Sequence, residues 1–123
     1  MILGVSMIAV SEAFVLAEKL GLDAKALYEV ASAASGQCWS LTSYCPVPGV
    51  GPVSPADNDY KPGFTAALML KDLALAQQAA AESGAATPLG AHAERLYRSF
   101  NESGGATQDF SAIIRHLAAS KRD

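Results

Sequence analysis

A helix-forming run with one charged pair in its middle is the feature that most constrains this fold. Residues 63–76 read Gly-Phe-Thr-Ala-Ala-Leu-Met-Leu-Lys-Asp-Leu-Ala-Leu-Ala. At about 100° per residue, Lys71 falls on the same side of a helix as five residues, four of them apolar: Phe64, Ala67, Leu68, Leu75 and Gln78. Buried lysines are rare, so the Lys71 side chain is expected either to extend to a rim or to point into a cavity that holds an anion. In the second case this helix forms one wall of a binding site.

Two interpretations of Lys71 and its neighbour Asp72 stay open from these residues alone. As a structural residue, Lys71 extends along the helix and pairs with Asp72 or Glu82. As a functional residue, it presents its charge to a carboxylate or a phosphate. Asp72 lies about 100° further round the helix. There it orients a neighbouring lysine or accepts hydrogen bonds from the backbone amides of another element.

Composition favours helices and excludes several classes of partner. The 123 residues suffice for one domain with a real core, and alanine and leucine dominate over β-branched runs. A formal net charge of −3 gives no basic surface for nucleic acid. The apolar start gives way to Ser11 and Glu12 well short of a membrane span, and it lacks the basic segment of a signal peptide. We therefore expect no nucleic-acid or membrane partner, and a location in the cytoplasm or, in a eukaryote, the mitochondrial matrix.

Helices account for the whole chain apart from its connections, and no segment alternates as a strand does. Asp23 and the pair Thr87-Pro88 begin two of them, and Gly21 and Ser83-Gly84 end two others. The expected ranges are about 2–20, 23–34, 38–44, 64–82 and 87–103, followed by a last helix that Thr107 or Asp109 caps and that buries Phe110, Ile113, Ile114 and Leu117. The predicted fold class is all-α, a compact multi-helix domain.

Residues 45–63 form a long connection that holds five of the six prolines and three glycines. Loops of this length inside a compact domain are usually functional or disordered. Four residues supply apolar anchors: Val47, Val50, Val53 and Tyr60. We therefore predict an ordered loop packed over the domain.

The first helix lacks an N-cap. Its opening residues Ile2-Leu3-Gly4-Val5 include no Ser, Thr, Asp or Asn, and the helix is apolar nearly all round until Ser11 and Glu12. Such a start is typical of a helix that continues upstream and is covered on several sides. We expect this chain to be a fragment of a longer protein, and its apolar face to drive self-association into a dimer or larger oligomer.

No metal site is expected. Cys38 and Cys45 are seven residues apart, which is the spacing neither of a redox pair nor of a zinc site, so both are predicted to be reduced thiols. His92 and His116 lie far apart, outside any ligand motif. The chain also lacks a P-loop, a His-Glu-x-x-His helix and a dinucleotide-binding glycine motif after a strand.

Trp39 and Tyr44 are the remaining candidates for a site. They follow the turn at Gly36 and directly precede the proline-rich connection. Two large side chains at this place either fill the corner between helices or form an aromatic wall that closes a small-molecule pocket. Each has a polar tip that could reach a ligand.

Several groups of residues carry a family resemblance. In order, they are residues 6–13 with Gly21-Leu22-Asp23, residues 35–39 with 44–49, residues 60–76, and Pro88-Leu89-Gly90 with Asp109-Phe110-Ser111. Together they resemble the C-terminal domain of 3-hydroxyisobutyrate dehydrogenase, a β-hydroxyacid dehydrogenase whose domain is similar to that of 6-phosphogluconate dehydrogenase. The likeness extends over essentially the whole chain.

The resemblance implies one all-α domain at residues 1–123 that completes the substrate pocket and forms the dimer. Its partner in the family is an N-terminal Rossmann domain for the nicotinamide cofactor, which is absent here. Lys71 matches a cofactor-binding position, and Trp39, Tyr44 and Asp72 match the substrate end of the cleft. The family reaction is the reversible NAD-dependent oxidation of a short 3-hydroxy acid to its semialdehyde, with hydride transfer to the nicotinamide.

The family's catalytic lysine and the asparagine after it would lie upstream of Met1, and neither Lys19 nor Lys25 matches them. We therefore expect this chain to be inactive alone, as one part of an NAD-dependent 3-hydroxyisobutyrate dehydrogenase. Two alternatives stay open. One is a free-standing helical dimerisation module without catalysis, and the other is a domain of a related tartronate semialdehyde reductase-type enzyme.

Overall fold

The computed structural model describes residues 1–122, and within that range it contains helices and helical turns but no strand. The all-α prediction is confirmed. The elements are α1 (Ile2–Lys19), α2 (Ala24–Ser32), α3 (Trp39–Thr42), a 3-10 turn (Pro55–Asn58), α4 (Ala66–Ser83), α5 (Pro88–Phe100), a π-helical turn (Asn101–Gly105), a second 3-10 turn (Phe110–Ala112) and α6 (Ile113–Ala119).

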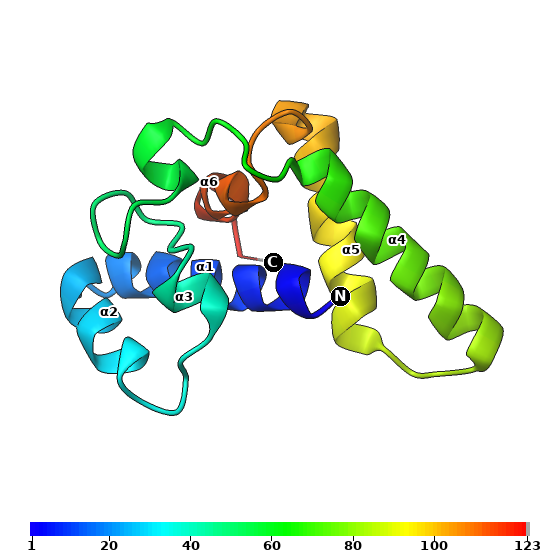
Figure 1. Ribbon diagram of the computed structural model, residues 1–123, viewed down its shortest axis with the longest axis horizontal. Coiled ribbons are helices and arrows are strands. Elements are labelled where there is room, and N and C mark those ends of the chain that lie inside the picture. The colour runs from blue at the N-terminus through cyan, green and yellow to red at the C-terminus, as the bar shows by residue number, and fades with distance from the viewer. Residues whose placement is uncertain (123) are drawn as a thin grey trace.

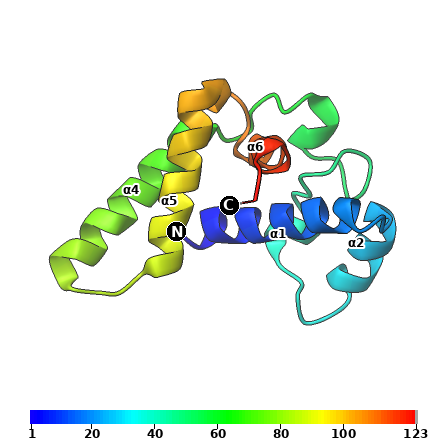
Figure 2. The ribbon, with the colours of Figure 1, turned by 180° about the vertical axis from the view of Figure 1, so that it is seen from behind.

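The helices form two groups joined through α1 (Figure 1). Helices α4 and α5 run antiparallel as a hairpin at one end, and α2 and α3 lie at the other end. α1 extends between the two groups and packs against α5, α3 and α2. The view from behind shows α6 nearly end-on above the horizontal α1, so the two helices cross where they pack (Figure 2). The proline-rich connection 45–63 passes beside α6, and its first residues pack against the second half of α1.

Two clusters of buried side chains hold this arrangement together. The larger one joins α1, α4, α5 and α6, and its most deeply buried members include Met7, Met69, Leu73, Tyr97, Phe110 and Ile113. The smaller one joins the second half of α1 to α3 and the following loop through Val10, Phe14, Leu41 and Cys45. Burial of this apolar surface is the main force that stabilises the fold.

The predicted helix ends are accurate where a local signal sets them. The Asp23 carboxylate accepts a hydrogen bond from the amide of Ala26 at 3.2 Å, and Gly84 has the left-handed φ of 71° that ends α4. Thr87 is the residue before α5, but its hydroxyl donates to Gln77 at 3.2 Å rather than capping the helix. The expected helix 87–103 ends instead at Phe100, because the chain widens into a π-helical turn in which Gly104 has a φ of 99°.

The connection 45–63 is ordered and packed, as predicted. The Tyr60 hydroxyl donates to the carbonyl of Pro46 at 2.7 Å, and the Ser54 hydroxyl donates to the carbonyl of Cys45 at 2.9 Å. Tyr60 is buried and Val50 is partly buried. The prediction for Val53 is wrong, since its side chain is 92% exposed.

Candidate functional site

Trp39 and Tyr44 lie together, as the sequence predicted. Trp39 begins α3 and Tyr44 follows it, so the short helix returns the chain and their rings stack with centroids 5.0 Å apart and an interplanar angle of 22°. Trp39 is 52% exposed, and Tyr44 is partly buried beneath it. Such a pair presents a flat, half-exposed aromatic surface, which is suited to contact with a small ligand.

The aromatic surface continues inward from this pair. The Tyr44 ring lies 5.3 Å from that of Phe110, and the Phe110 ring meets Phe64 edge-on at 5.7 Å. Phe110 is fully buried, whereas Phe64 is only partly covered and directly precedes the Thr65 N-cap of α4. The row therefore connects exposed Trp39 to the start of the helix that carries Lys71.

The Asp109 carboxylate lies at the centre of this row and is completely buried. Its Oδ1 accepts three hydrogen bonds, from the Tyr44 hydroxyl at 2.8 Å and from the amides of Gly63 and Phe64 at 3.0 and 3.1 Å. Its Oδ2 accepts two more, from the amide of Ser111 at 3.0 Å and from the Ser111 hydroxyl. The sequence identified Asp109 only as a helix cap, because its partners 45 to 65 residues away leave no local signal.

The Tyr44 phenol is held in its protonated form. Burial raises its pKa, and the hydrogen bond and negative charge of Asp109 raise it further. The hydroxyl proton is thereby committed to Asp109. The Tyr44 hydroxyl is therefore used inside the domain, and Trp39 is the more exposed member of the aromatic pair.

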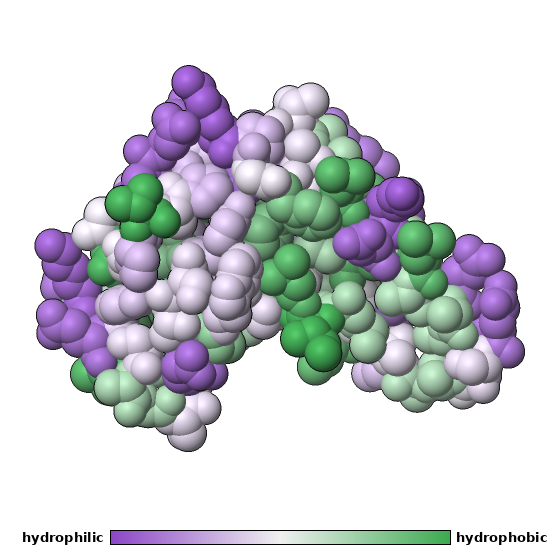
Figure 3. Space-filling view, in the orientation of Figure 1, coloured by the Kyte–Doolittle hydropathy of each residue, from purple (hydrophilic) through white to green (hydrophobic). Residues whose placement is uncertain are grey.

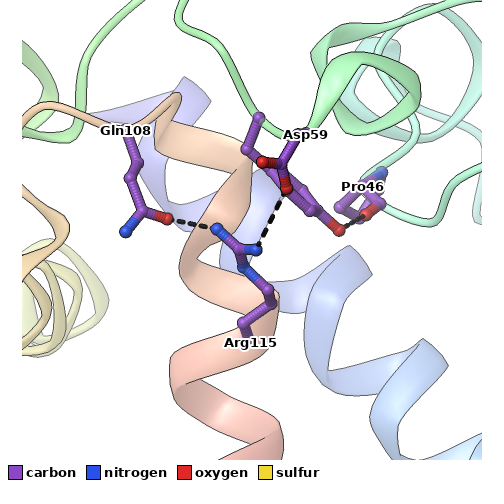
Figure 4. Close-up of polar contacts among 5 residues, drawn as sticks. Pro46, Asp59, Gln108 and Arg115 are labelled. Carbon is purple, nitrogen blue, oxygen red and sulfur yellow. Dashed lines mark hydrogen bonds and ion pairs between the residues drawn. The ribbon is translucent and has the colours of Figure 1, made fainter.

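A strained turn brings the amides of Gly63 and Phe64 to Asp109. Asp59 and Tyr60 both have positive φ, 50° and 55°, which is costly for residues other than glycine. Several contacts hold them there (Figure 4): the Arg115 guanidinium lies 4.4 Å from the centre of the Tyr60 ring and 3.7 Å from the Asp59 carboxylate. Arg115 also donates to Gln108, and the Tyr60 hydroxyl donates to Pro46. The turn is therefore fixed by side chains outside the aromatic row.

Lys71 and Asp72 lie on the outer face of α4. The buried stripe of that helix is Ala66, Met69, Leu73 and Ala80, so the side that carries Lys71 faces outward and not into the domain. Both charged residues are exposed, and neither makes a hydrogen bond or an ion pair with any other residue in the range 1–122. The alternative that pairs Lys71 with Asp72 or Glu82 is wrong, and the Glu82 carboxylate instead accepts from Gln78 at 3.0 Å.

Lys71 stands among apolar surface. Leu68, one turn before it, is 46% exposed, and Leu75, one turn after it, is 54% exposed. Figure 3 shows apolar surface gathered in the middle of this face and along α4, with hydrophilic atoms among it. A lysine between two exposed leucines is suited to a ligand that is partly anionic and partly apolar.

The N-terminus of α4 does not supply an anion-binding site on this face. The amide of Ala66 donates to the carbonyl of Gln108 at 2.8 Å, and that of Ala67 donates to Ala106 at 3.0 Å. The next amide, of Leu68, donates to the Thr65 hydroxyl at 3.2 Å. The free amides that make helix ends bind anions are thus already used.

The remaining polar candidates do not converge on a site. Both cysteines carry free thiols, and within residues 1–122 no three His, Cys, Asp or Glu side chains lie together as metal ligands would. His92 contacts Arg95 of the same helix, α5, at 3.2 Å, and His116 of α6 contacts Ser99 of α5 at 3.2 Å, both on the surface. Over the same part of the chain, every helix is too short or too polar to cross a bilayer.

Comparison with known proteins gives one consistent family. Residues 1–117 match the family described as "NAD-binding of NADP-dependent 3-hydroxyisobutyrate dehydrogenase". A Mycobacterium tuberculosis protein named "Probable 3-hydroxyisobutyrate dehydrogenase" is 55% identical over 119 residues, which are 97% of this chain and 40% of that protein. The mitochondrial 3-hydroxyisobutyrate dehydrogenase of Drosophila melanogaster is 45% identical over 98% of this chain and 37% of its own length.

The fold agrees with the sequence match. A structure of the M. tuberculosis 3-hydroxyisobutyrate dehydrogenase with L-serine superposes with a TM-score of 0.92 at 55% identity, again over 97% of this chain and 40% of that one. The chain spans about two fifths of the length of these relatives. The family resemblance of the sequence is confirmed, and the chain belongs to the 3-hydroxyisobutyrate dehydrogenase family whose members carry this helical NAD-binding region.

Proposed function

We propose that this chain is the C-terminal, substrate-completing and dimerising domain of an NAD-dependent 3-hydroxyisobutyrate dehydrogenase. The observation that carries the proposal is the match to the M. tuberculosis enzyme, in sequence and in fold, over nearly the whole chain. Its partner within the enzyme is a Rossmann domain, which belongs to the part of the relatives that this chain does not span. The same assignment places the protein in the bacterial cytoplasm or the mitochondrial matrix.

Four residues of this chain bind the cofactor and the substrate: Lys71, Trp39, Tyr44 and Asp72. Lys71 holds the cofactor, since it is an exposed cation flanked by exposed leucines with no partner in residues 1–122. Trp39 and Tyr44 enclose the short carbon chain of the acid, and Asp72 contacts its polar end. When bound, NAD⁺ supplies the hydride acceptor. Apolar surface around the site excludes water from the reacting carbon.

Neither the Tyr44 phenol nor the Asp109 carboxylate is free to act as a general base at this site. The Tyr44 hydroxyl is committed to Asp109, and Asp109 is buried with both oxygens occupied. Lys71 is a binding residue, since no acid or base lies in hydrogen-bond contact with it within residues 1–122. We assign proton transfer to the catalytic lysine that the family resemblance implies outside this chain, and we expect the isolated chain to be inactive.

Self-association is part of the same proposal. Ile2 at the start of α1 is 85% exposed and Leu89 at the start of α5 is 71% exposed, and with Met1, Val5 and Pro88 they line an apolar groove. Covering such a surface favours a homodimer or a larger oligomer. Light scattering of the purified chain is expected to give at least twice the monomer mass. A monomer at high protein concentration would contradict this part of the proposal.

A chimeric enzyme tests the function. The 119 matching residues of the M. tuberculosis enzyme are replaced by this chain, which keeps the relative's own Rossmann domain and supplies the second half of the site from this protein. The chimera is expected to oxidise 3-hydroxyisobutyrate with reduction of NAD⁺. This chain alone, and the M. tuberculosis protein without the matched segment, are the controls and should be inactive.

Two results would contradict the proposed function. One is a chimera that is folded by circular dichroism and binds NAD⁺ but does not oxidise 3-hydroxyisobutyrate. The other is activity of this chain alone, which would place the whole reaction within residues 1–123. Preference in the reverse reaction for tartronate semialdehyde over the semialdehyde formed from 3-hydroxyisobutyrate would change the substrate and keep the domain assignment.

A further inference from the structure

We propose that Asp109 is a positioning residue for the substrate wall: its carboxylate fixes the Tyr44 ring under Trp39 and fixes the backbone that leads into α4. The inference rests on the proposed function for what the wall binds. It rests on geometry for how the wall is held, since one buried carboxylate joins residue 44, residues 63–64 and residue 111 through five hydrogen bonds.

Asp109 is linked to Trp39 through the Tyr44 ring. The Tyr44 ring lies between Trp39 at 5.0 Å and Phe110 at 5.3 Å, and aromatic contacts of this kind leave a ring free to slide in its plane. The hydrogen bond of 2.8 Å from the Tyr44 hydroxyl to Asp109 fixes the far end of the ring. Trp39, half exposed, rests on that ring. The position of the outer aromatic surface is therefore set from the buried carboxylate.

Asp109 is linked to α4 through the backbone that precedes the helix. The amides of Gly63 and Phe64 both donate to the same oxygen that accepts from Tyr44. A Cβ atom at Gly63 would lie 2.9 Å from the Tyr44 hydroxyl oxygen, so backbone and ring are in direct contact and neither can shift alone. Phe64 is followed by Thr65, the N-cap of the helix that carries Lys71. One carboxylate thus sets the aromatic wall relative to the start of the lysine helix.

Asp109 acts only through these neighbours. It is completely buried, Oδ1 accepts three hydrogen bonds and Oδ2 accepts two, which leaves no lone pair for a substrate. A carboxylate is suited to this role because it is an acceptor at every position. An asparagine side chain at this position would carry one NH₂ group in place of an acceptor oxygen. That NH₂ group would face other donors, either at the Tyr44 side or at the Ser111 side.

Trp39 provides a readout that does not depend on catalysis. It is the single tryptophan of the chain and contacts Tyr44 directly. In the purified chain, Asp109→Asn is expected to abolish most of the near-ultraviolet circular dichroism of Trp39 and to increase its quenching by acrylamide. Thr87→Val is the matched control, since it removes a part-buried hydroxyl hydrogen bond of 3.2 Å to Gln77 in the α4–α5 hairpin and leaves the Tyr44–Asp109 bond in place. It should leave both Trp39 signals unchanged.

The kinetic readout uses the chimeric enzyme. Asp109→Asn is expected to raise KM for 3-hydroxyisobutyrate by about tenfold per folded active site, the effect of one lost hydrogen bond to a charged group, while Thr87→Val leaves it within about twofold. Because Asp109 acts through Tyr44, adding Asp109→Asn to Tyr44→Phe should raise KM by much less than tenfold.

Loss of folded protein with unchanged KM per active site and an unchanged Trp39 signal would show a purely structural role and overturn the proposal. If Asp109→Asn does not fold, Tyr44→Phe decides, because it removes one of the five hydrogen bonds and keeps the carboxylate. An unchanged Trp39 signal in that variant would overturn the proposal as well. A chimera without activity would count against the proposed function, whereas the Trp39 measurements on the chain would still decide the role of Asp109.

Discussion

Replacing Lys71 by alanine in the chimeric enzyme is expected to lower kcat/KM by about 10- to 100-fold, because a hydrogen bond to a charged group contributes about 1.5–3 kcal/mol. The larger part should appear as a higher KM for NAD⁺, since the cation binds the cofactor in both ground and transition states. Stability should change by less than about 0.5 kcal/mol, because Lys71 is exposed and makes no hydrogen bond or ion pair within residues 1–122. Steady-state kinetics in both substrates measure the first effect and urea unfolding the second.

Lys25→Ala is the matched control for this prediction. Lys25 is also an exposed helical lysine, but it lies on α2 at the opposite end of the molecule from α4 (Figure 1). Its loss should leave all kinetic constants within about twofold. Lys71→Arg keeps the charge and should retain part of the affinity. Unchanged constants for both substrates in Lys71→Ala would remove Lys71 from the site.

The fold is expected to lose stability steeply above pH 9. Burial raises the pKa of the Tyr97 phenol, which is fully buried, and of Tyr60, both from an ordinary value of 10.0, and it raises the pKa of the Cys45 thiol from 9.0. Below those ordinary values both folded and unfolded chains keep the protons, so the full stability is present. Above them the unfolded chain ionises first, and each group then costs about 1.4 kcal/mol per pH unit until its folded pKa is reached.

Urea unfolding at pH 7, 9, 10 and 11 under reducing conditions measures this loss. Tyr97→Phe removes the hydrogen bond from its hydroxyl to the carbonyl of Phe110 and so lowers stability at pH 7, but it should reduce the slope above pH 10. Gly84→Ala is a control of similar cost at pH 7, about 1 kcal/mol from its left-handed φ, and keeps every tyrosine. A free energy of unfolding that is constant to pH 11, or parallel curves for the two variants, would contradict the prediction.

Local signals in the sequence predict where the helices begin and end, but they do not predict which side of a helix is buried. Asp23 and Gly84 mark helix ends by side-chain and backbone chemistry within one turn, and the structure has both where they were expected. The face of α4 is different. Periodicity showed that Lys71 shares a side with leucines, yet whether that side is covered depends on which of two apolar stripes meets α5, and Met69 and Leu73 meet it.

In the candidate site too, residues with a local sequence signal are predictable and residues joined by long-range contacts are not. Trp39 and Tyr44 were found because they are aromatic, close in sequence and next to a proline-rich connection. Asp109 was missed as the residue that joins them to α4, since a single aspartate before an apolar stripe has the appearance of a helix cap, and it is also that. The strained turn at Asp59 and Tyr60 was equally hidden, because the contacts that fix it come from Arg115 in the last helix.

The distance along the chain between Tyr44 and Asp109 also decides when the site can exist. The α4–α5 hairpin joins neighbouring helices through a connection of four residues and needs nothing from the rest of the chain to bring its two arms together. By contrast, the donors on Tyr44, Gly63 and Phe64 pair with an acceptor, Asp109, that lies 45 to 65 residues later in the chain. During synthesis on a ribosome, these donors have only water until residue 109 has left the exit tunnel. The aromatic wall is therefore completed only after both of the elements that it joins have been made.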